Sequence, residues 1–402
     1  MARGVDVVVE GPLAPFASGF RDELARLGYK VEQTDKHMRV LAQLSGWMAQ
    51  RGVGPGALSA EVVEEFFCER RQAGHVWLIT GMAAKPLLGF LREAGVVPPP
   101  SRPVPSSPAG VLVERYLEFL VSQRGLVPAT VAHYGVAARL FIEAVGGHEG
   151  RDLGSLSAAE VTRFVTGACA RPVKLSAREL VSALRSFLRF LHVEGVTAGP
   201  LAQAVPAYAS WTASALPRPL PAEQTARLLA SCDRRTAHGR RDYAVLVLLS
   251  RLGLRAGEVA GLVLEHIDWR AGELVVRGKG PREERLPLPA DVGEAVAGYL
   301  RRGRPNAASR AVFLRCFAPL VGLSPTGVTW VVYFACERAG LPRVGAHRLR
   351  HSAACDMLRA GASLAEIGQV LRHRRAGTTA IYAKVDHAAL SPLARPWPGS
   401  AS

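Results

Sequence analysis

The feature that most constrains the fold is a proline-rich stretch, VPPPSRPVPSSPAG, at residues 97–110. Proline fixes the backbone angle φ and has no N–H to donate, so this stretch cannot form a helix interior or a central strand. A second break, which includes PAYASWTASALPRPLP, lies at residues 201–221. The two breaks predict two linkers and three folded units, at about residues 1–96, 111–200 and 222–402.

Charge and hydropathy indicate the kind of partner. The chain has 402 residues, with 50 Lys and Arg against 34 Asp and Glu, for a net charge of +16. This balance favours a polyanionic partner, nucleic acid before a membrane. The longest apolar run, YAVLVLL at 243–249, is far too short to span a bilayer. The six cysteines form no CxxC pair and the N-terminus has no signal-like pattern, so we expect a cytoplasmic protein with reduced thiols.

Two segments of the first unit recur in the second. LSAEVVEEF (58–66) resembles LSAAEVTRF (156–164), and FLREAGV (90–96) resembles FLHVEGV (190–196). Apolar residues follow helical spacing in both units. We therefore expect the first unit to be a helical module that duplicates the second. The alternative is that amphipathic helices of one composition look alike.

The third unit combines helices with a small β element. RRDYAVLVLLSRLGLRAGEVAGL (240–262) predicts a buried helix that Gly253 interrupts before helix resumes. GELVVRGKGPREERLPLP (272–289) predicts a β-hairpin with a Gly-Lys-Gly turn. Helical spacing returns after Pro289. The predicted fold class is therefore mainly α with a small β element.

Three familiar kinds of site do not fit this sequence. His347 and His351 in HRLRHSAA have the i, i+4 spacing of zinc ligands, but no glutamate lies between them and Arg348 and Arg350 flank the site. The glycine spacing in 272–280 is wrong for a Walker loop, and a GxSxG motif is absent from the sequence. We therefore expect no metal site, no ATP binding by a Walker loop and no serine-hydrolase chemistry.

What remains is a set of cations and hydrogen-bond donors without an acid. Its members come from separate segments: Arg255, Lys279, His347, Arg350 and His373. Such donors suit a pentavalent phosphate, because arginine binds non-bridging oxygens, histidine donates a further hydrogen bond and lysine can protonate a leaving oxygen. Tyr382, in TTAIYAKV, offers a nucleophile. A tyrosine hydroxyl has a reference pKa of about 10, so it must lose its proton in a cationic setting.

These elements together resemble a known family. GLRAGEVAGL, GKGPREERLPL, HRLRHSAA and VLRHRRAGTTAIY occur in the order found in tyrosine recombinases, also called phage-type integrases. The resemblance covers residues 222 to about 387, and unit 111–200 resembles the family's helical, SAM-like core-binding domain. It implies a helical core-binding domain followed by an α+β catalytic domain. Residues 1–96 are not standard for the family and look like a second helical DNA-contacting module. One departure is Arg372, which stands where the family pattern LGH has glycine and adds a charge near the phosphate.

The resemblance also implies a mechanism. Tyr382 attacks a DNA phosphodiester and forms a 3′-phosphotyrosyl link, while Lys279 protonates the departing 5′ oxygen. The other members of the set clamp the phosphate and help to transfer protons: Arg255, Arg350, His347 and His373. Because the ester conserves the bond energy, neither ATP nor a metal cofactor is required. Four protomers, of this chain or mixed with other recombinases, normally act together on double-stranded DNA.

Other polar residues have less specific signals. We expect the following to contact DNA, against the alternative of a solvated surface: Thr130, Lys174, Arg178, Arg185, Arg282 and Arg285. Thr130 is also a candidate N-cap of its helix. His351 and Arg348 are expected to be structural, and Arg255 has an alternative partner in Glu258 at i+3.

The expected function is site-specific recombination for a mobile element, with DNA integration and transposition among its expected processes. The direction of the reaction stays open between integration, excision, inversion and resolution. A type IB topoisomerase-like enzyme would share the chemistry but relax supercoiled DNA without a specific site. A catalytically silent DNA-binding partner is a third reading, although such a protein would not need the six residues of the set.

Overall fold

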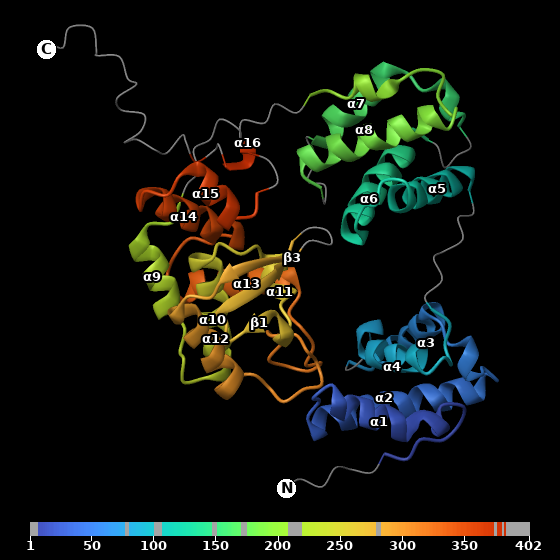
Figure 1. Ribbon diagram of the computed structural model, residues 1–402. Helices are drawn as coiled ribbons and strands as arrows, with labels where there is room; N and C mark the ends of the chain where they lie inside the picture. The colour runs from blue at the N-terminus through green and yellow to red at the C-terminus, as the bar shows by residue number, and fades with distance from the viewer. Residues whose placement is uncertain are drawn as a thin grey trace, which may run out of the picture. The chain divides into compact units, whose positions relative to one another are not determined.

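The structure is a computed structural model, and it describes residues 7–76, 80–99, 107–146, 151–169, 175–207, 219–278, 283–373, 376–379 and 382. These residues are mostly helical and enclose three main hydrophobic cores (Figure 1). We call the parts around these cores the N-terminal unit (7–99), the middle unit (107–207) and the C-terminal unit (219–382). In the described part of the chain, no helix is both long and apolar enough to cross a membrane.

The N-terminal unit is built from helices around an apolar core. Its main helices are α1 (Ala17–Arg26), α2 (Val31–Gln50), α3 (Ala60–Gln72) and α4 (Gly81–Glu93), with 3-10 turns at Ala14–Phe16 and Pro55–Ala57. Leu24, Leu41, Phe67 and Leu91 are fully buried between these helices. Each of these helices thus packs one apolar face into the core, as the helical spacing of apolar residues predicts.

The middle unit has the same general design. Its helices are α5 (Pro108–Ser122), α6 (Pro128–Ala144), α7 (Ala158–Cys169) and α8 (Ala177–Val193), with 3-10 turns at Leu153–Ser155 and Leu201–Ala204. Tyr116, Phe141 and Phe187 are fully buried at its centre. The N-cap of α6 is Val127, so the expectation that Thr130 caps this helix is wrong. Pro128 begins the helix earlier, since its missing N–H has no partner to lose at the first position.

The two helical units repeat the same local devices. A 3-10 turn precedes both α3 and α7. The Ser59 hydroxyl accepts a hydrogen bond from a backbone N–H in the first turn of α3, and the Ser157 hydroxyl does so for α7. Gly95 ends α4 with φ of 70°, and Gly195 ends α8 with φ of 72°. These matching caps and ends lie at the sequence offsets of 98 and 100 residues that the repeated segments have.

The C-terminal unit adds a small sheet to a helical domain. Its helices are α9 (Ala222–Ala230), α10 (Ala237–Arg251), α11 (Ala256–Ala260), α12 (Ala290–Arg302), α13 (Pro325–Arg338), α14 (Ala346–Arg359), α15 (Leu364–Val370) and α16 (Ala376–Thr379), with a 3-10 turn at Leu264–His266. The strands β1 (Ile267–Asp268), β2 (Glu273–Arg277) and β3 (Glu283–Pro287) form an antiparallel sheet in the order β1-β2-β3. The fold class predicted from the sequence is confirmed, and so is the hairpin of β2 and β3. The sequence did not predict β1, because a strand of two residues shows no alternation.

Helix α10 is the central helix of this unit. The segment 244–249 is buried on every side, and α10 packs against α12, α13 and α14. The chain then breaks at Gly253, as predicted, with φ of 58°. A Cβ atom at Gly253 would lie 2.5 Å from Cδ2 of Leu371, so only glycine fits both this backbone angle and this space. The break allows α11 to start in a new direction at residue 256.

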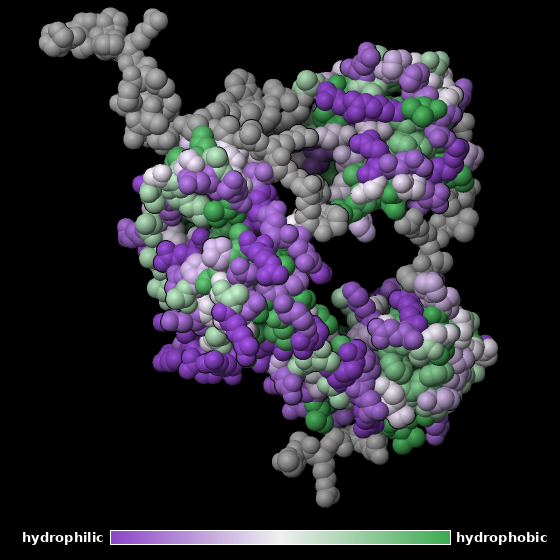
Figure 2. Space-filling model, viewed as in Figure 1, coloured by the Kyte–Doolittle hydropathy of each residue, from purple (hydrophilic) through white to green (hydrophobic). Residues whose placement is uncertain are grey.

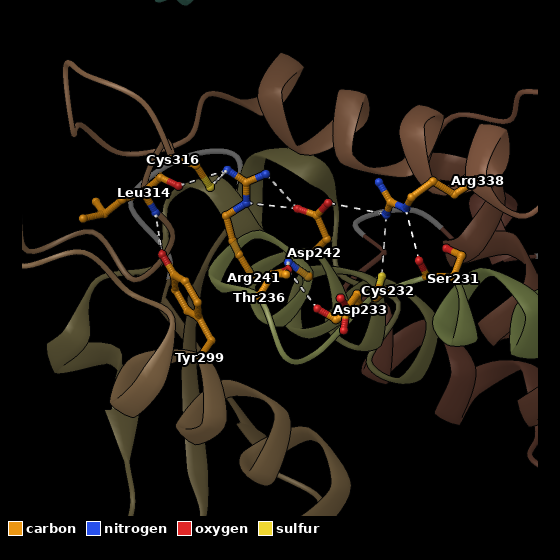
Figure 3. Close-up of polar contacts among 11 residues, drawn as sticks. Ser231, Cys232, Asp233, Thr236, Arg241, Asp242, Tyr299, Leu314, Cys316 and Arg338 are labelled. Carbon is orange, nitrogen blue, oxygen red and sulfur yellow. Dashed lines mark hydrogen bonds and ion pairs between the residues drawn. The ribbon is translucent and has the colours of Figure 1, made fainter.

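A buried carboxylate ties α10 to its neighbours (Figure 3). The Asp242 carboxylate accepts hydrogen bonds from Nε and Nη2 of Arg241, at 3.0 and 2.7 Å, and from Nη2 of Arg338 on α13 at 3.5 Å. Arg241 also donates to the Leu314 carbonyl oxygen and to Sγ of Cys316 in the segment before α13. Because Asp242 and Arg241 are both largely buried, this network must remain paired.

Replacing Asp242 tests that network. Asp242→Ala leaves the Arg241 guanidinium buried without its counter-charge, which should lower the stability of the C-terminal unit by about 3–5 kcal/mol. Hydrogen-exchange mass spectrometry should show faster exchange in α10 and α13. Asp233→Ala, which removes the exposed partner of Arg235, is the control and should leave exchange unchanged. Equal exchange in the two variants would contradict the assigned role of Asp242.

Candidate active site

Arg255 lies at the start of α11, directly after the Gly253 break. Its backbone N–H donates to Oε2 of Glu258 at 2.8 Å, and its Nη1 donates to Oε1 at 2.6 Å. The arginine side chain is nevertheless 41% exposed, while that of Glu258 is 4% exposed. The ion pair considered in the sequence analysis therefore exists, and it holds Arg255 while leaving its outer face open to a ligand.

Helix α14 brings three polar residues of HRLRHSAA together. His347 and Arg350 are separated by one helical turn, and the His351 ring contacts the His347 ring with centroids 4.4 Å apart. Arg350 is 1% exposed and donates hydrogen bonds to the carbonyl oxygens of Gly253 and Leu371. Burial, and then the Arg255 charge, lowers the pKa of Arg350 to about 10, so Arg350 remains charged at neutral pH.

Arg372 closes the other side of this charge cluster. Its Nη2 donates to Oε2 of Glu258 at 2.7 Å, and its side chain is 2% exposed. Its φ of 55° lies in the left-handed region, which is unfavourable for any residue with a Cβ. Burial raises the pKa of Glu258, but the Arg372 charge and the hydrogen bonds from Arg255 outweigh it, so the pKa is lowered and the carboxylate stays ionised.

His373 follows Arg372 and faces the same cluster. Its Nδ1 lies 2.7 Å from Oγ1 of Thr379 on α16. Burial, followed by the charges of Arg350 and Arg255, lowers the pKa of His373 to about 4. At neutral pH its imidazole is therefore neutral and retains one N–H to donate.

Tyr382 is buried in the small core that includes Ile367 and Leu371. Its hydroxyl oxygen lies 2.8 Å from Nδ1 of His351, and its ring is parallel to that of His373, with centroids 6.3 Å apart. Burial raises the pKa of Tyr382 to about 12, although the Arg350 charge acts in the opposite direction. The structure thus brings the tyrosine into the same cluster as the arginines and histidines.

Comparisons with known proteins agree with this geometry. The phage integrase family matches residues 218–389, and the phage integrase N-terminal SAM-like domain matches residues 113–195. The integrase/recombinase y4rA of Sinorhizobium fredii is 42% identical over 397 residues, covering 98% of this chain and 96% of that protein. The chain belongs to the phage integrase family, the tyrosine recombinases.

Solved structures show the same fold at low identity. The Tn1549 transposon integrase in complex with a circular intermediate DNA has a TM-score of 0.56 at 14% identity, covering 70% of the recombinase and 99% of that chain. A λ integrase tetramer bound to a Holliday junction has a TM-score of 0.53 at 16% identity, covering 74% of the recombinase and 85% of that chain. The family resemblance found in the sequence is confirmed.

The expected DNA-contacting residues lie in different settings. Lys174 and Arg282 lie outside the described residues, as does the expected catalytic Lys279; β2 ends at Arg277 and β3 begins at Glu283. Thr130 is half-buried in the first turn of α6, Arg178 is exposed on α8, and Arg285 pairs with Glu273 across the hairpin at 2.9 Å.

Arg185 has a structural partner in the recombinase. Its Nη2 donates to the carbonyl oxygens of Val205 and Pro206, at 3.0 and 3.2 Å. These bonds tie α8 to the segment that follows the last 3-10 turn of the middle unit. That Arg185 contacts DNA stays a prediction, and the contact would have to use the N–H groups other than those of Nη2.

Sequence reasoning missed two contacts in the site. The bond between His351 and Tyr382 joins residues 31 positions apart and leaves no local pattern. The pairing of Arg372 with Glu258 spans 114 positions. A hint of the second existed, because Glu258 at i+3 from Arg255 was already a candidate carboxylate partner. The sequence could not show that one carboxylate serves both arginines.

Arg372 gives a test of the charge cluster. Arg372→Ala loses the buried ion pair, at about 3–5 kcal/mol, and keeps the unfavourable backbone angle. Arg372→Gly loses the same pair but removes about 1–2 kcal/mol of left-handed strain, so it should be the more stable of the two. Thermal unfolding followed by calorimetry measures the difference, with exposed Arg359→Ala as the unaffected control. Equal stability of the Ala and Gly variants would contradict strain at Arg372.

Proposed function

We propose that the recombinase cuts and rejoins double-stranded DNA through a 3′-phosphotyrosyl intermediate on Tyr382. The observation that carries this proposal is the cluster of Arg255, Arg350 and His373 around the buried tyrosine, within a chain of the tyrosine recombinase family. Two of the similar solved structures are integrases in complex with DNA. An arrangement with several cations and no free carboxylate fits a phosphodiester better than a neutral substrate.

The proposed roles follow from the chemistry of each group. The exposed side of Arg255 and the N–H groups of Arg350 stabilise the charge that develops on the phosphate oxygens. His347 and His373 are neutral donors to the same oxygens, because partial desolvation and the neighbouring arginines lower both of their pKa values. Lys279 supplies the proton for the departing 5′ oxygen. A 5′-hydroxyl from another strand then reverses the step and releases Tyr382.

We further propose that four protomers act together, for a mobile element. The λ integrase similar to this chain is a tetramer on a Holliday junction, and the Tn1549 integrase belongs to a transposon. The proposed domains are a helical module at 1–96, a core-binding domain at 111–200 and a catalytic domain at 222–402, joined by linkers. The matched caps and helix ends of the first two units support their origin by duplication.

Charge is distributed unevenly among these domains. Residues 1–96 hold 11 Lys and Arg against 11 Asp and Glu, and residues 97–200 hold 11 against 8. Residues 201–402 hold 28 against 15. Figure 2 shows hydrophilic residues over much of the visible face of the C-terminal unit. We therefore propose that most of the electrostatic attraction to DNA comes from the catalytic domain and that the N-terminal module adds little.

Tyr382→Phe tests the nucleophile. A pool of nicked duplexes with randomised centres is incubated with the protein, because a nick lets the released 5′ fragment diffuse away and traps the covalent adduct. The native protein should form adducts that survive denaturation, and Tyr382→Phe should form none, since the ring lacks the attacking oxygen. Tyr333→Phe on α13 is the matched control and should retain the native adduct level. Adducts at equal levels in Tyr382→Phe would exclude this residue as the nucleophile.

Two exposed arginines test the DNA-binding surface. Arg178 on α8 and Arg39 on α2 both lie on solvent-facing helix surfaces. Arg178→Gln should weaken binding to a trapped duplex and reduce the slope of log affinity against log salt by about 0.9, the effect of one lost phosphate contact. Arg39→Gln should leave affinity and slope unchanged. Fluorescence anisotropy at several salt concentrations measures both, and an unchanged slope for Arg178→Gln would remove it from the proposed surface.

A further inference from the structure

His351 contacts the reacting atom of the proposed nucleophile. Its Nδ1 lies 2.8 Å from the Tyr382 hydroxyl oxygen, which is hydrogen-bond distance. The two rings are inclined at 60°, with centroids 5.6 Å apart. His351 is half-buried on α14, one residue after the buried Arg350. Because α14 is anchored in the core through Ala353 and Ala354, the imidazole is fixed in place.

The protonation states of the two groups allow Tyr382 to be the donor of this hydrogen bond. Burial, and then the charges of His347, Arg350 and Arg348, lowers the pKa of His351 to about 4, so the ring is neutral at neutral pH. Tyr382 has its pKa raised to about 12 and keeps its proton. A neutral imidazole has one donor and one acceptor nitrogen, and in the tautomer with the ring proton on Nε2 the tyrosine hydroxyl donates to Nδ1.

The other histidines are less suited to this task. Nδ1 of His373 is already 2.7 Å from the Thr379 hydroxyl, and its ring lies parallel to the tyrosine ring rather than toward its oxygen. The His347 ring contacts the His351 ring, with centroids 4.4 Å apart, and among the described residues the hydrogen-bond partner of the Tyr382 hydroxyl is His351. The arrangement leaves the Nδ1 atom of His351 as the acceptor in contact with the hydroxyl proton.

We propose that His351 orients the Tyr382 hydroxyl and accepts its proton as the oxygen attacks the phosphate. This inference rests on the proposed recombinase chemistry and deepens it. The tyrosine O–H bond breaks and the proton goes to Nδ1 of His351, while the oxygen forms a bond to phosphorus. The bond from phosphorus to the 5′ oxygen breaks, and that oxygen takes a proton from Lys279. The reverse attack returns both protons, so no other reactant is consumed.

Binding of DNA makes His351 a stronger base. In the free protein, the groups that face it are His347, Arg348 and Arg350 from its own helix, together with Tyr382 and His373 from the following segment. The charges of Arg348 and Arg350 oppose protonation of the His351 ring. A phosphodiester held by Arg255 and Arg350 adds a negative charge that offsets this repulsion and stabilises an imidazolium. Proton transfer is therefore favoured only when the substrate is present.

Two substitutions of His351 separate orientation from proton transfer. His351→Asn places an amide oxygen near the position of Nδ1, so it can accept the hydrogen bond but cannot take the proton. His351→Ala loses both functions. The readout is the single-turnover rate of adduct formation on nicked duplexes selected by trapping with native protein, measured across pH. His238→Asn, an exposed histidine on α10, is the control and should behave as the native protein.

The expected result is a change in pH dependence as well as in rate. The native rate should be level near neutral pH, because His351 is already deprotonated. His351→Asn should be slower by about 100-fold or more, and its rate should rise about tenfold per pH unit, following the small fraction of tyrosinate. His351→Ala should be slower still. If the rate of His351→Asn had the same pH dependence as the native rate, whatever its magnitude, the role of His351 in proton transfer would be overturned.

A sulfur leaving group gives an independent test. A duplex with sulfur in place of the bridging 5′ oxygen needs no protonation of the leaving group, so it should rescue Lys279→Ala but not His351→Asn. Rescue of His351→Asn would show that His351 acts on the leaving group and would overturn the inference. If the native protein traps no duplex from the pool, the proposed function fails and this inference fails with it. If the native protein forms adducts and both His351 variants react with native kinetics, this inference is refuted while the proposed function stands.

Discussion

The active-site cluster depends on one buried carboxylate. Glu258 is 4% exposed and pairs with Arg255 and Arg372, and Oε2 lies 3.9 Å from Nη1 of Arg350. Without this carboxylate the three guanidinium groups would repel each other strongly, because Arg350 and Arg372 are buried. Its carboxylate also accepts the backbone N–H of Arg255, the N-cap residue of α11, so the charge centre is fixed to the backbone. One side chain thus joins the segments around residues 255, 350 and 372.

This arrangement keeps the site positive without protonating a histidine. Burial, and then the neighbouring charges that include Arg350, lowers the pKa values of His347, His351 and His373. The neutral rings then have both a donor and an acceptor nitrogen, which a protonated ring lacks. The same burial raises the pKa of Tyr382, so its hydroxyl keeps its proton in the free protein. An incoming anion screens the arginine charges and so raises the pKa values of the histidines, but it does not lower the pKa of Tyr382, whose proton therefore needs an acceptor.

The parts of the fold and of the candidate site that depend on residues close together in the chain could be predicted from the sequence. The break at Gly253, the hairpin of β2 and β3 and the shared helix face of His347 and Arg350 each follow from patterns within a few residues. The family resemblance then supplied the order of the catalytic set. The bond of His351 to Tyr382 could not be predicted, because the separation of 31 residues is bridged by packing of the small core around α14 and α15.

Arg372 shows why a departure from a family pattern needs the structure. Where the pattern has glycine, a left-handed backbone angle costs nothing, whereas an arginine at φ of 55° bears a strain of about 1–2 kcal/mol. The gain that offsets this strain is the 2.7 Å ion pair with the carboxylate that also pairs with Arg255. Nη2 of Arg372 binds Oε2 of Glu258 while Nη1 of Arg255 binds Oε1, so two guanidiniums share the charge of one carboxylate. The Arg255 side chain stays 41% exposed in this arrangement, so an arginine at position 372 leaves its outer face open to a phosphate.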